Sequence, residues 1–92
     1  MNAFFDELTA LLVEAAKERG ATIDPPQLDA KMSELLLNFA AVVAHTRERR
    51  FAPLSTYVAG LAAARLHAAD KNADLISFID AVKAKLEPKT TT

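Results

Sequence analysis

The stretch AHTRERRFAPLSTYVAG, Ala44–Gly60, decides the fold because it is predicted to join two helices. Pro53 cannot donate an intrahelical hydrogen bond, and it biases the residue before it towards extended geometry. We therefore expect the helix before the junction to run to about Arg49. The next helix is predicted to begin at Pro53 or Leu54, or just after Ser55 if that hydroxyl is the cap.

The helix that leads into this junction has the clearest predicted start in the chain. Residues 24–27 (Asp-Pro-Pro-Gln) supply an N-cap acid, a proline at the first helical position and a glutamine at N3, which resembles a capping box. A broad apolar stripe at helical spacing follows, formed by Leu28, Met32, Leu35, Leu36, Phe39, Val42 and Val43. Leu37, Ala40 and Ala41 widen this stripe, so we expect the helix to be central.

Three further helices are predicted, one before this central helix and two after it. Near the amino terminus Asn2 can cap an amphipathic helix that Gly20 closes. In the helix after Pro53, Gly60 costs about 1 kcal/mol relative to alanine, so we expect another helix backbone to approach it closely. Asn72 can cap the last helix, which Pro88 stops.

We therefore predict an all-α fold, a compact four-helix domain with short connections. The domain is expected to span residues 1–88, and residues 89–92 are expected to form a frayed tail. Short connections favour antiparallel packing of neighbouring helices.

The composition indicates that this domain meets a partner. Only 92 residues are present and 51% of them are hydrophobic, whereas a chain of this length buries a thin core. We expect an apolar face that contacts another protein or a second copy, since small soluble domains rarely leave large apolar patches bare. Neither a secretory signal nor a membrane-spanning apolar run is found in the sequence, so the predicted location is the cytoplasm.

Catalytic and metal chemistry lack a suitable pattern of residues. The sequence contains no cysteine, and its two histidines, His45 and His67, do not have the spacing of a metal-binding pair. Ser55 and Thr56 are not in a strand-turn-helix elbow of the kind that activates a nucleophile. We therefore expect no metal, no cofactor and no enzymatic activity.

A local anion site is one alternative function. A helix N-terminus presents unpaired N–H groups and a partial positive charge. The side chains that would join it are His45, Arg47, Arg49, Arg50, Ser55 and Thr56. A purely structural interpretation also fits, because basic residues favour helix C-termini and Ser or Thr favour caps. In that interpretation Phe51, Leu54 and Tyr57 are core residues.

Nucleic-acid binding is the second alternative, because a short basic turn joins two helices, as in a helix-turn-helix. In such motifs the second helix carries polar base-reading residues. Here that helix is mostly alanine, leucine and glycine, and Arg65 and His67 come only near its end. The formal net charge of −1 also gives no general affinity for phosphate backbones.

The junction resembles the signature of a known family. The residues that carry the resemblance are Ala44-His45, Arg49, Ala52-Pro53-Leu54-Ser55-Thr56-Tyr57 and Gly60-Leu61-Ala62-Ala63. This pattern is similar to the signature of a small helical domain of unknown function. That domain occurs alone or fused to molybdenum cofactor guanylyltransferases. Three positions depart from the family's pattern: Ser55 stands where threonine is usual, Tyr57 where phenylalanine is common, and Arg65 where glycine is frequent.

The resemblance implies association with the molybdenum cofactor pathway or with molybdenum enzymes, and it brings no established activity with it. The motif positions that would carry a shared role are His45, Arg49, Pro53, Ser55, Thr56 and Gly60. Of these, Pro53 and Gly60 are expected to be structural. We therefore expect a non-catalytic accessory or small-subunit interaction module, with a protein partner or homo-oligomerisation.

Overall fold

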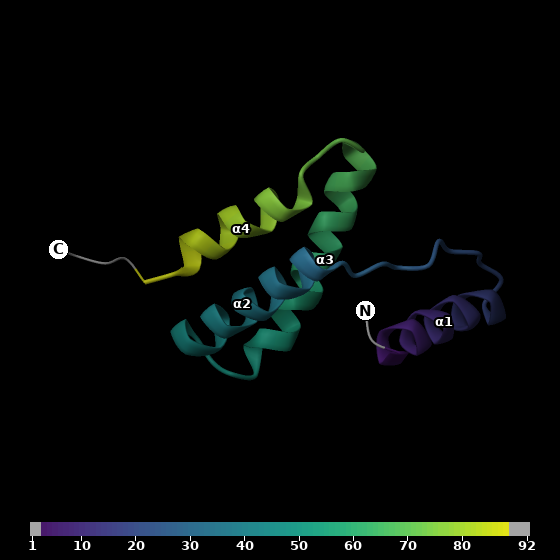
Figure 1. The fold of residues 1–92 in the computed structure, drawn as a ribbon, viewed down its shortest axis with the longest axis horizontal. Helices are drawn as coiled ribbons and strands as arrows, with labels where there is room; N and C mark the ends of the chain where they lie inside the picture. Colours follow the sequence, from purple (N-terminus) through teal and green to yellow (C-terminus); the bar gives the residue numbers. More distant parts are fainter. Residues whose placement is uncertain (1–2, 89–92) are drawn as a thin grey trace. The chain divides into compact units, whose positions relative to one another are not determined.

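A computed structural model of the chain describes residues 3–88. Within these residues the chain forms four α-helices and no strand (Figure 1). They are α1 (Ala3–Glu18), α2 (Ala30–Thr46), α3 (Phe51–Ala69) and α4 (Leu75–Leu86). The all-α prediction is confirmed for this part of the chain. The predicted cap Asn2 and the predicted frayed tail, residues 89–92, lie outside the described residues.

The chain divides into two compact units, Met1–Ala30 and Lys31–Thr92. The first unit contains α1 and the segment after it, and the second contains nearly all of α2 together with α3 and α4. The expectation of one domain over residues 1–88 stays a prediction.

Helix α1 of the first unit ends as the sequence predicts. Gly20 has a φ of +81°, a left-handed conformation that residues with a Cβ rarely adopt. Its N–H donates to the carbonyl of Lys17 at 2.9 Å, and the N–H of Ala21 donates to the carbonyl of Ala16 at 2.9 Å. These bonds satisfy the last carbonyls of the helix, so the stop at Gly20 is confirmed.

The predicted capping box at residues 24–27 is wrong. Residues 21–29 are not helical, and α2 begins only at Ala30. Each proline biases the residue before it away from helical geometry, so two consecutive prolines keep this segment extended. The hydroxyl of Thr9 donates to the carbonyl of Pro26 at 3.2 Å, which holds the segment against α1. The connection between α1 and α2 is therefore longer than the predicted short connection.

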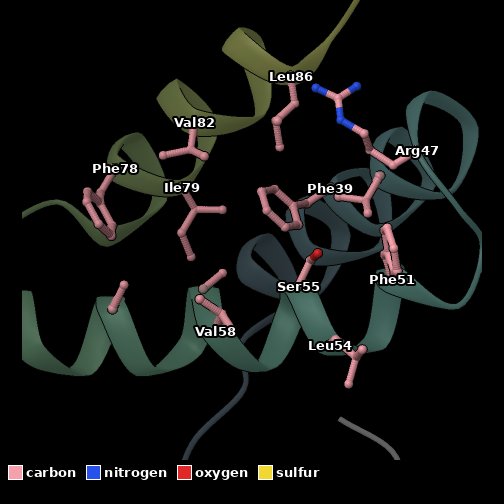
Figure 2. Close-up of a pocket in the computed structure, with 13 residues that line it drawn as sticks. Phe39, Arg47, Phe51, Leu54, Ser55, Val58, Phe78, Ile79, Val82 and Leu86 are labelled. Atoms are coloured by element: carbon pink, nitrogen blue, oxygen red, sulfur yellow. The ribbon is translucent and has the colours of Figure 1, made fainter.

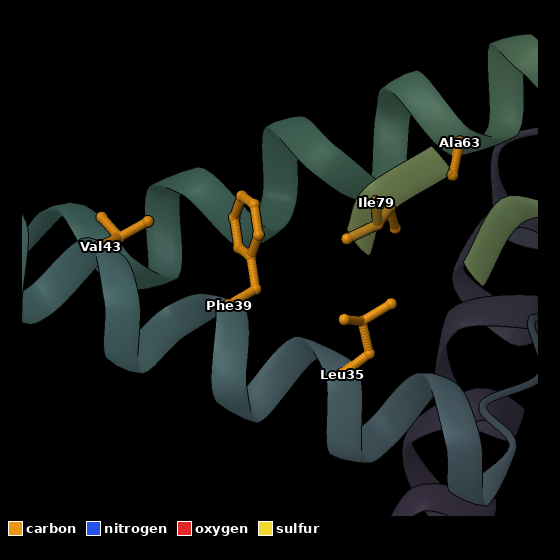
Figure 3. Packing of buried hydrophobic residues seen from close by; sticks show 5 residues of the cluster. All are labelled: Leu35, Phe39, Val43, Ala63 and Ile79. Atoms are coloured by element: carbon orange, nitrogen blue, oxygen red, sulfur yellow. The ribbon is translucent and has the colours of Figure 1, made fainter. Parts of the chain in front are cut away.

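The core of the second unit joins its three helices (Figure 3). The buried residues come from α2 (Leu35, Phe39 and Val43), from α3 (Ala63) and from α4 (Ile79). The three α2 positions are four residues apart and therefore lie on one helical face. Figure 3 shows Phe39, Leu35 and Ile79 directed into the space between the helices. As predicted from its apolar stripe, α2 supplies most of this core.

The predicted helix bounds at the junction are wrong by a few residues on both sides. Helix α2 ends at Thr46 instead of near Arg49, and the hydroxyl of Thr46 donates back to the carbonyl of Val42 at 2.7 Å. Helix α3 begins at Phe51, ahead of Pro53. A proline is tolerated there because the N–H groups of the first turn have no intrahelical acceptor.

Two further local predictions fail. Asp74, not Asn72, caps α4, since its carboxylate accepts from the N–H of Ser77 at 3.0 Å. Gly60 has no close helix neighbour, because a Cβ built on it would meet nothing within 4 Å. Its place in α3 is therefore not explained by packing within the described residues.

Candidate functional site

An open apolar groove of about 600 Å³ lies between α2, α3 and α4 (Figure 2). Its longest wall is one face of α3, formed by Phe51, Leu54, Ser55, Val58, Ala59 and Ala62. These positions follow the spacing i, i+3, i+4, i+7, i+8 and i+11, which is one continuous side of a helix over three turns. Helix α4 contributes Phe78, Ile79, Val82 and Leu86.

The floor of the groove is the core of the unit. Phe39, Val43 and Ile79 line the groove and are also buried core residues. The walls are open to solvent, since Leu54 is 64% exposed and Val58 is 63% exposed. An occupant of this groove would therefore cover large apolar side chains that α2, α3 and α4 leave exposed.

Two polar residues interrupt this lining, Arg47 and Ser55. Figure 2 shows Arg47 at the same end of the groove as Phe51 and Leu86. One guanidinium nitrogen of Arg47 donates to the carbonyl of Thr46 at 3.1 Å, and the guanidinium carries further N–H donors. The groove is thus an apolar surface with a cationic end.

The start of α3 does not offer the free backbone donors expected of an anion site. The N–H of Phe51 donates to the carbonyl of Glu48 at 3.0 Å, and the N–H of Ala52 donates to the carbonyl of Arg49 at 3.1 Å. The next residue, Pro53, has no N–H. The backbone groups that would bind a phosphate are therefore already used or missing.

The six predicted site residues do not converge on one point. Arg47 and Ser55 line the groove, whereas the other four are not part of its lining. His45 is exposed in the last turn of α2, and Arg49 is exposed in the turn after it. Thr56 lies in the second turn of α3, where its hydroxyl donates to the carbonyl of Pro53 at 2.8 Å.

Arg50 is engaged locally at the surface. Its guanidinium lies 3.4 Å from the carboxylate of Glu48, and both side chains are largely exposed. It also lies 5.7 Å from the centre of the Phe51 ring. An exposed ion pair of this kind contributes little to stability. The ring contact places the guanidinium of Arg50 beside Phe51, a groove residue.

One pKa shift stands out, in the last turn of α4. The side chain of Lys83 donates to the carboxylate of Glu87 at 2.5 Å, and this hydrogen bond raises the pKa of Lys83 above its ordinary value. The nearby charges of Glu87 and Asp80 act in the same direction. Lys83 therefore keeps its positive charge throughout the physiological range.

Two other kinds of site were sought within residues 3–88. No group of three or more His, Cys, Asp or Glu side chains there is arranged to hold a metal ion. No helix in that range has the length and apolar character needed to cross a bilayer.

The groove is the feature that the sequence did not locate. Phe51, Leu54 and Tyr57 are exposed, so the purely structural interpretation, which placed them in the core, is wrong on this point. Phe51 and Leu54 instead line the groove. The signal available in the sequence was that the apolar positions from Phe51 to Ala62 occupy more of α3 than one packed side requires.

The sequence matches the family described as Domain of unknown function (DUF6457) over residues 2–91. The chain belongs to this family. No curated protein and no solved structure matches it. The expected resemblance of this chain to a small domain of unknown function is confirmed. The expected link between this domain and molybdenum cofactor guanylyltransferases stays a prediction.

Proposed function

We propose that this protein is a non-catalytic, cytoplasmic accessory module that binds another polypeptide in the groove between α2, α3 and α4. The observation that carries this proposal is the groove itself, a long apolar surface open to solvent. Its α3 wall runs over about three helical turns, the size of surface that an amphipathic helix covers. Filling it would bury Leu54, Val58 and Val82, which are exposed.

The partner that we propose is a molybdenum enzyme or a protein of molybdenum cofactor maturation. This choice depends on the resemblance of the junction to domains fused to molybdenum cofactor guanylyltransferases. Three of the residues that carry the resemblance, Leu54, Ser55 and Ala62, line the groove. These three positions are the part of the motif that a shared groove surface could use.

A matched pair of variants tests the groove. Leu54 and Leu37 are leucines on different helices with similar exposure, 64% and 71%, and Leu37 is not among the groove residues. Titration calorimetry would measure binding of the chain to the molybdenum cofactor guanylyltransferase of its host. Leu54→Asp should weaken binding by about tenfold or more, since a carboxylate would enter an apolar contact. Leu37→Asp should leave the affinity unchanged.

Two results would contradict the proposal. Equal binding by Leu54→Asp and the unchanged chain would remove the groove as the binding surface. No binding to the guanylyltransferase, or to the molybdenum enzymes of the same host, would remove the molybdenum link.

The two alternative functions have weaker support. An anion site at the start of α3 lacks free backbone donors, because the N–H groups of Phe51 and Ala52 are already bonded. Nucleic-acid binding requires a basic face that reads bases, whereas the exposed wall of α3 is apolar.

A further inference from the structure

The groove has the length of a binding site for one helix. Its α3 wall extends from Phe51 to Ala62, which is about 18 Å at 1.5 Å per residue. Phe78 and Leu86 mark the extent of the facing α4 wall. Recognition of this kind uses an amphipathic helix with apolar anchors at i, i+3 or i+4, and i+7.

Helix α1 has this pattern, and within its own unit the apolar stripe is not buried. Its large apolar residues include Phe4, Leu8, Leu11 and Leu12, all exposed, and no residue of α1 is buried. Phe4, Leu8 and Leu11 follow the spacing i, i+4 and i+7. With Ala15 this stripe covers twelve residues, the same length as the α3 wall of the groove.

The charges of the two surfaces are complementary. Residues 1–30 contain six acidic and two basic residues, a net charge of −4. Residues 31–92 contain nine basic and six acidic residues, a net charge of +3. On α1 the carboxylates of Glu7, Glu14 and Glu18 run beside the apolar stripe, and Arg47 lines one end of the groove. An acidic helix is attracted to a groove that has a cationic end.

We propose that the groove of one molecule binds α1 of a second copy, so that two chains exchange their first helices in a reciprocal dimer. Because each chain carries one helix and one groove, two copies satisfy both contacts in a closed two-fold assembly. This inference rests on the proposed role of the groove as a polypeptide-binding surface. Helix α1 of the second copy would occupy the groove when no other protein is bound there.

The first test is the mass of the full-length chain by light scattering at micromolar concentration. The expected mass is twice the chain mass of 10.0 kDa. Leu54→Asp, in the groove, and Leu11→Asp, on the apolar stripe of α1, should each give the monomer mass. Their controls are Leu37→Asp and Ala10→Asp, which should remain dimeric. A monomeric unchanged chain would overturn the proposal, and so would a dimer that neither groove nor stripe variant dissociates.

The second test mixes the two defective variants. The Leu54→Asp chain retains an intact α1, and the Leu11→Asp chain retains an intact groove, so the mixture can form one of the two reciprocal contacts. Fluorescence titration of one labelled variant with the other should show binding at least tenfold tighter than the self-association of either. Equal affinities would overturn the proposal, because any other interface gives no reason for the two defects to complement each other.

The outcomes separate this inference from the function on which it rests. A monomeric chain that still binds the guanylyltransferase through Leu54 would remove the exchanged dimer and leave the accessory role in place. If the dimer passes the mixing test and no molybdenum protein binds, the exchanged dimer stands and the accessory role is removed. Circular dichroism of each variant checks that its helices are formed.

Discussion

Ile79 gives the sharpest prediction about what holds the second unit together. It is the most buried core residue at 2% exposed, and it also forms part of the groove floor. Ile79→Ala removes three carbons, a loss of about 2.4 kcal/mol at about 0.8 kcal/mol each. A sealed cavity would add to this cost. Here the space left behind opens into the groove, so we expect a total of about 2–3 kcal/mol, at the low end of the range for such changes.

Urea unfolding followed by circular dichroism measures this loss. A 92-residue chain with a thin core is expected to have a free energy of unfolding near 5 kcal/mol. With a slope of about 1 kcal/mol per molar urea, the midpoint should fall by about 2–3 M. Leu37→Ala, at a position 71% exposed, should change stability by less than about 0.5 kcal/mol. Equal midpoints for the two variants would refute the assignment of the core.

Three local features and one ion pair give further predictions. Gly60→Ala should raise the free energy of unfolding by about 0.5–1 kcal/mol, because the new Cβ meets nothing within 4 Å; a loss measured by urea unfolding would contradict this. Gly20→Ala should lower it by about 1–2 kcal/mol, because φ is +81° there; no loss in the same assay would exclude strain. Asp74→Ala should lower it by about 1 kcal/mol and fray the start of α4, with weaker amide-exchange protection at Ser77 as the check. Glu87→Gln should lower the pKa of Lys83 towards its ordinary value, as measured by NMR titration. The raised pKa stabilises the folded state below about pH 10.4, the ordinary pKa of lysine. This stabilisation is lost only as the pH rises through the pKa of Lys83 in the folded state.

The helical nature of the chain could be predicted because it depends on local periodicity. Leu35, Phe39 and Val43 recur every four residues, and the structure places them together in the core. Gly20 ends α1 because a left-handed residue is needed there, and glycine adopts that conformation at the least cost. Both predictions follow from the geometry of a single helix.

Two predicted helix starts failed because the local sequence allowed more than one start. Residues 24–27 have the composition of a helix start, but the carbonyl of Pro26 is bonded to the hydroxyl of Thr9, seventeen residues away. Helix α3 begins ahead of Pro53 because a first-turn proline loses no intrahelical bond. The local sequence is compatible with both outcomes in each case, and the bond between Thr9 and Pro26 is a contact that it does not reveal.

The candidate site could be predicted only in part. Arg47 and Ser55 were among the expected residues, and both line the groove. The expected anion site depended on free N–H groups at the start of α3, and the turn before it uses them in bonds to Glu48 and Arg49. The position of a groove depends on how three helices pack, which no single segment encodes.

Helix α3 makes the strongest physical argument that the chain works with another polypeptide. Its large residues are nearly all apolar, and a helix of that kind is normally buried on most sides. In residues 3–88, Ala63 is the buried residue of α3, whereas Leu54, Tyr57 and Val58 are exposed. Leaving such side chains in water sacrifices roughly 1.5–3 kcal/mol for each large residue that a partner could cover. The composition of α3 is therefore that of a helix with two packed sides, of which α2 and α4 supply one.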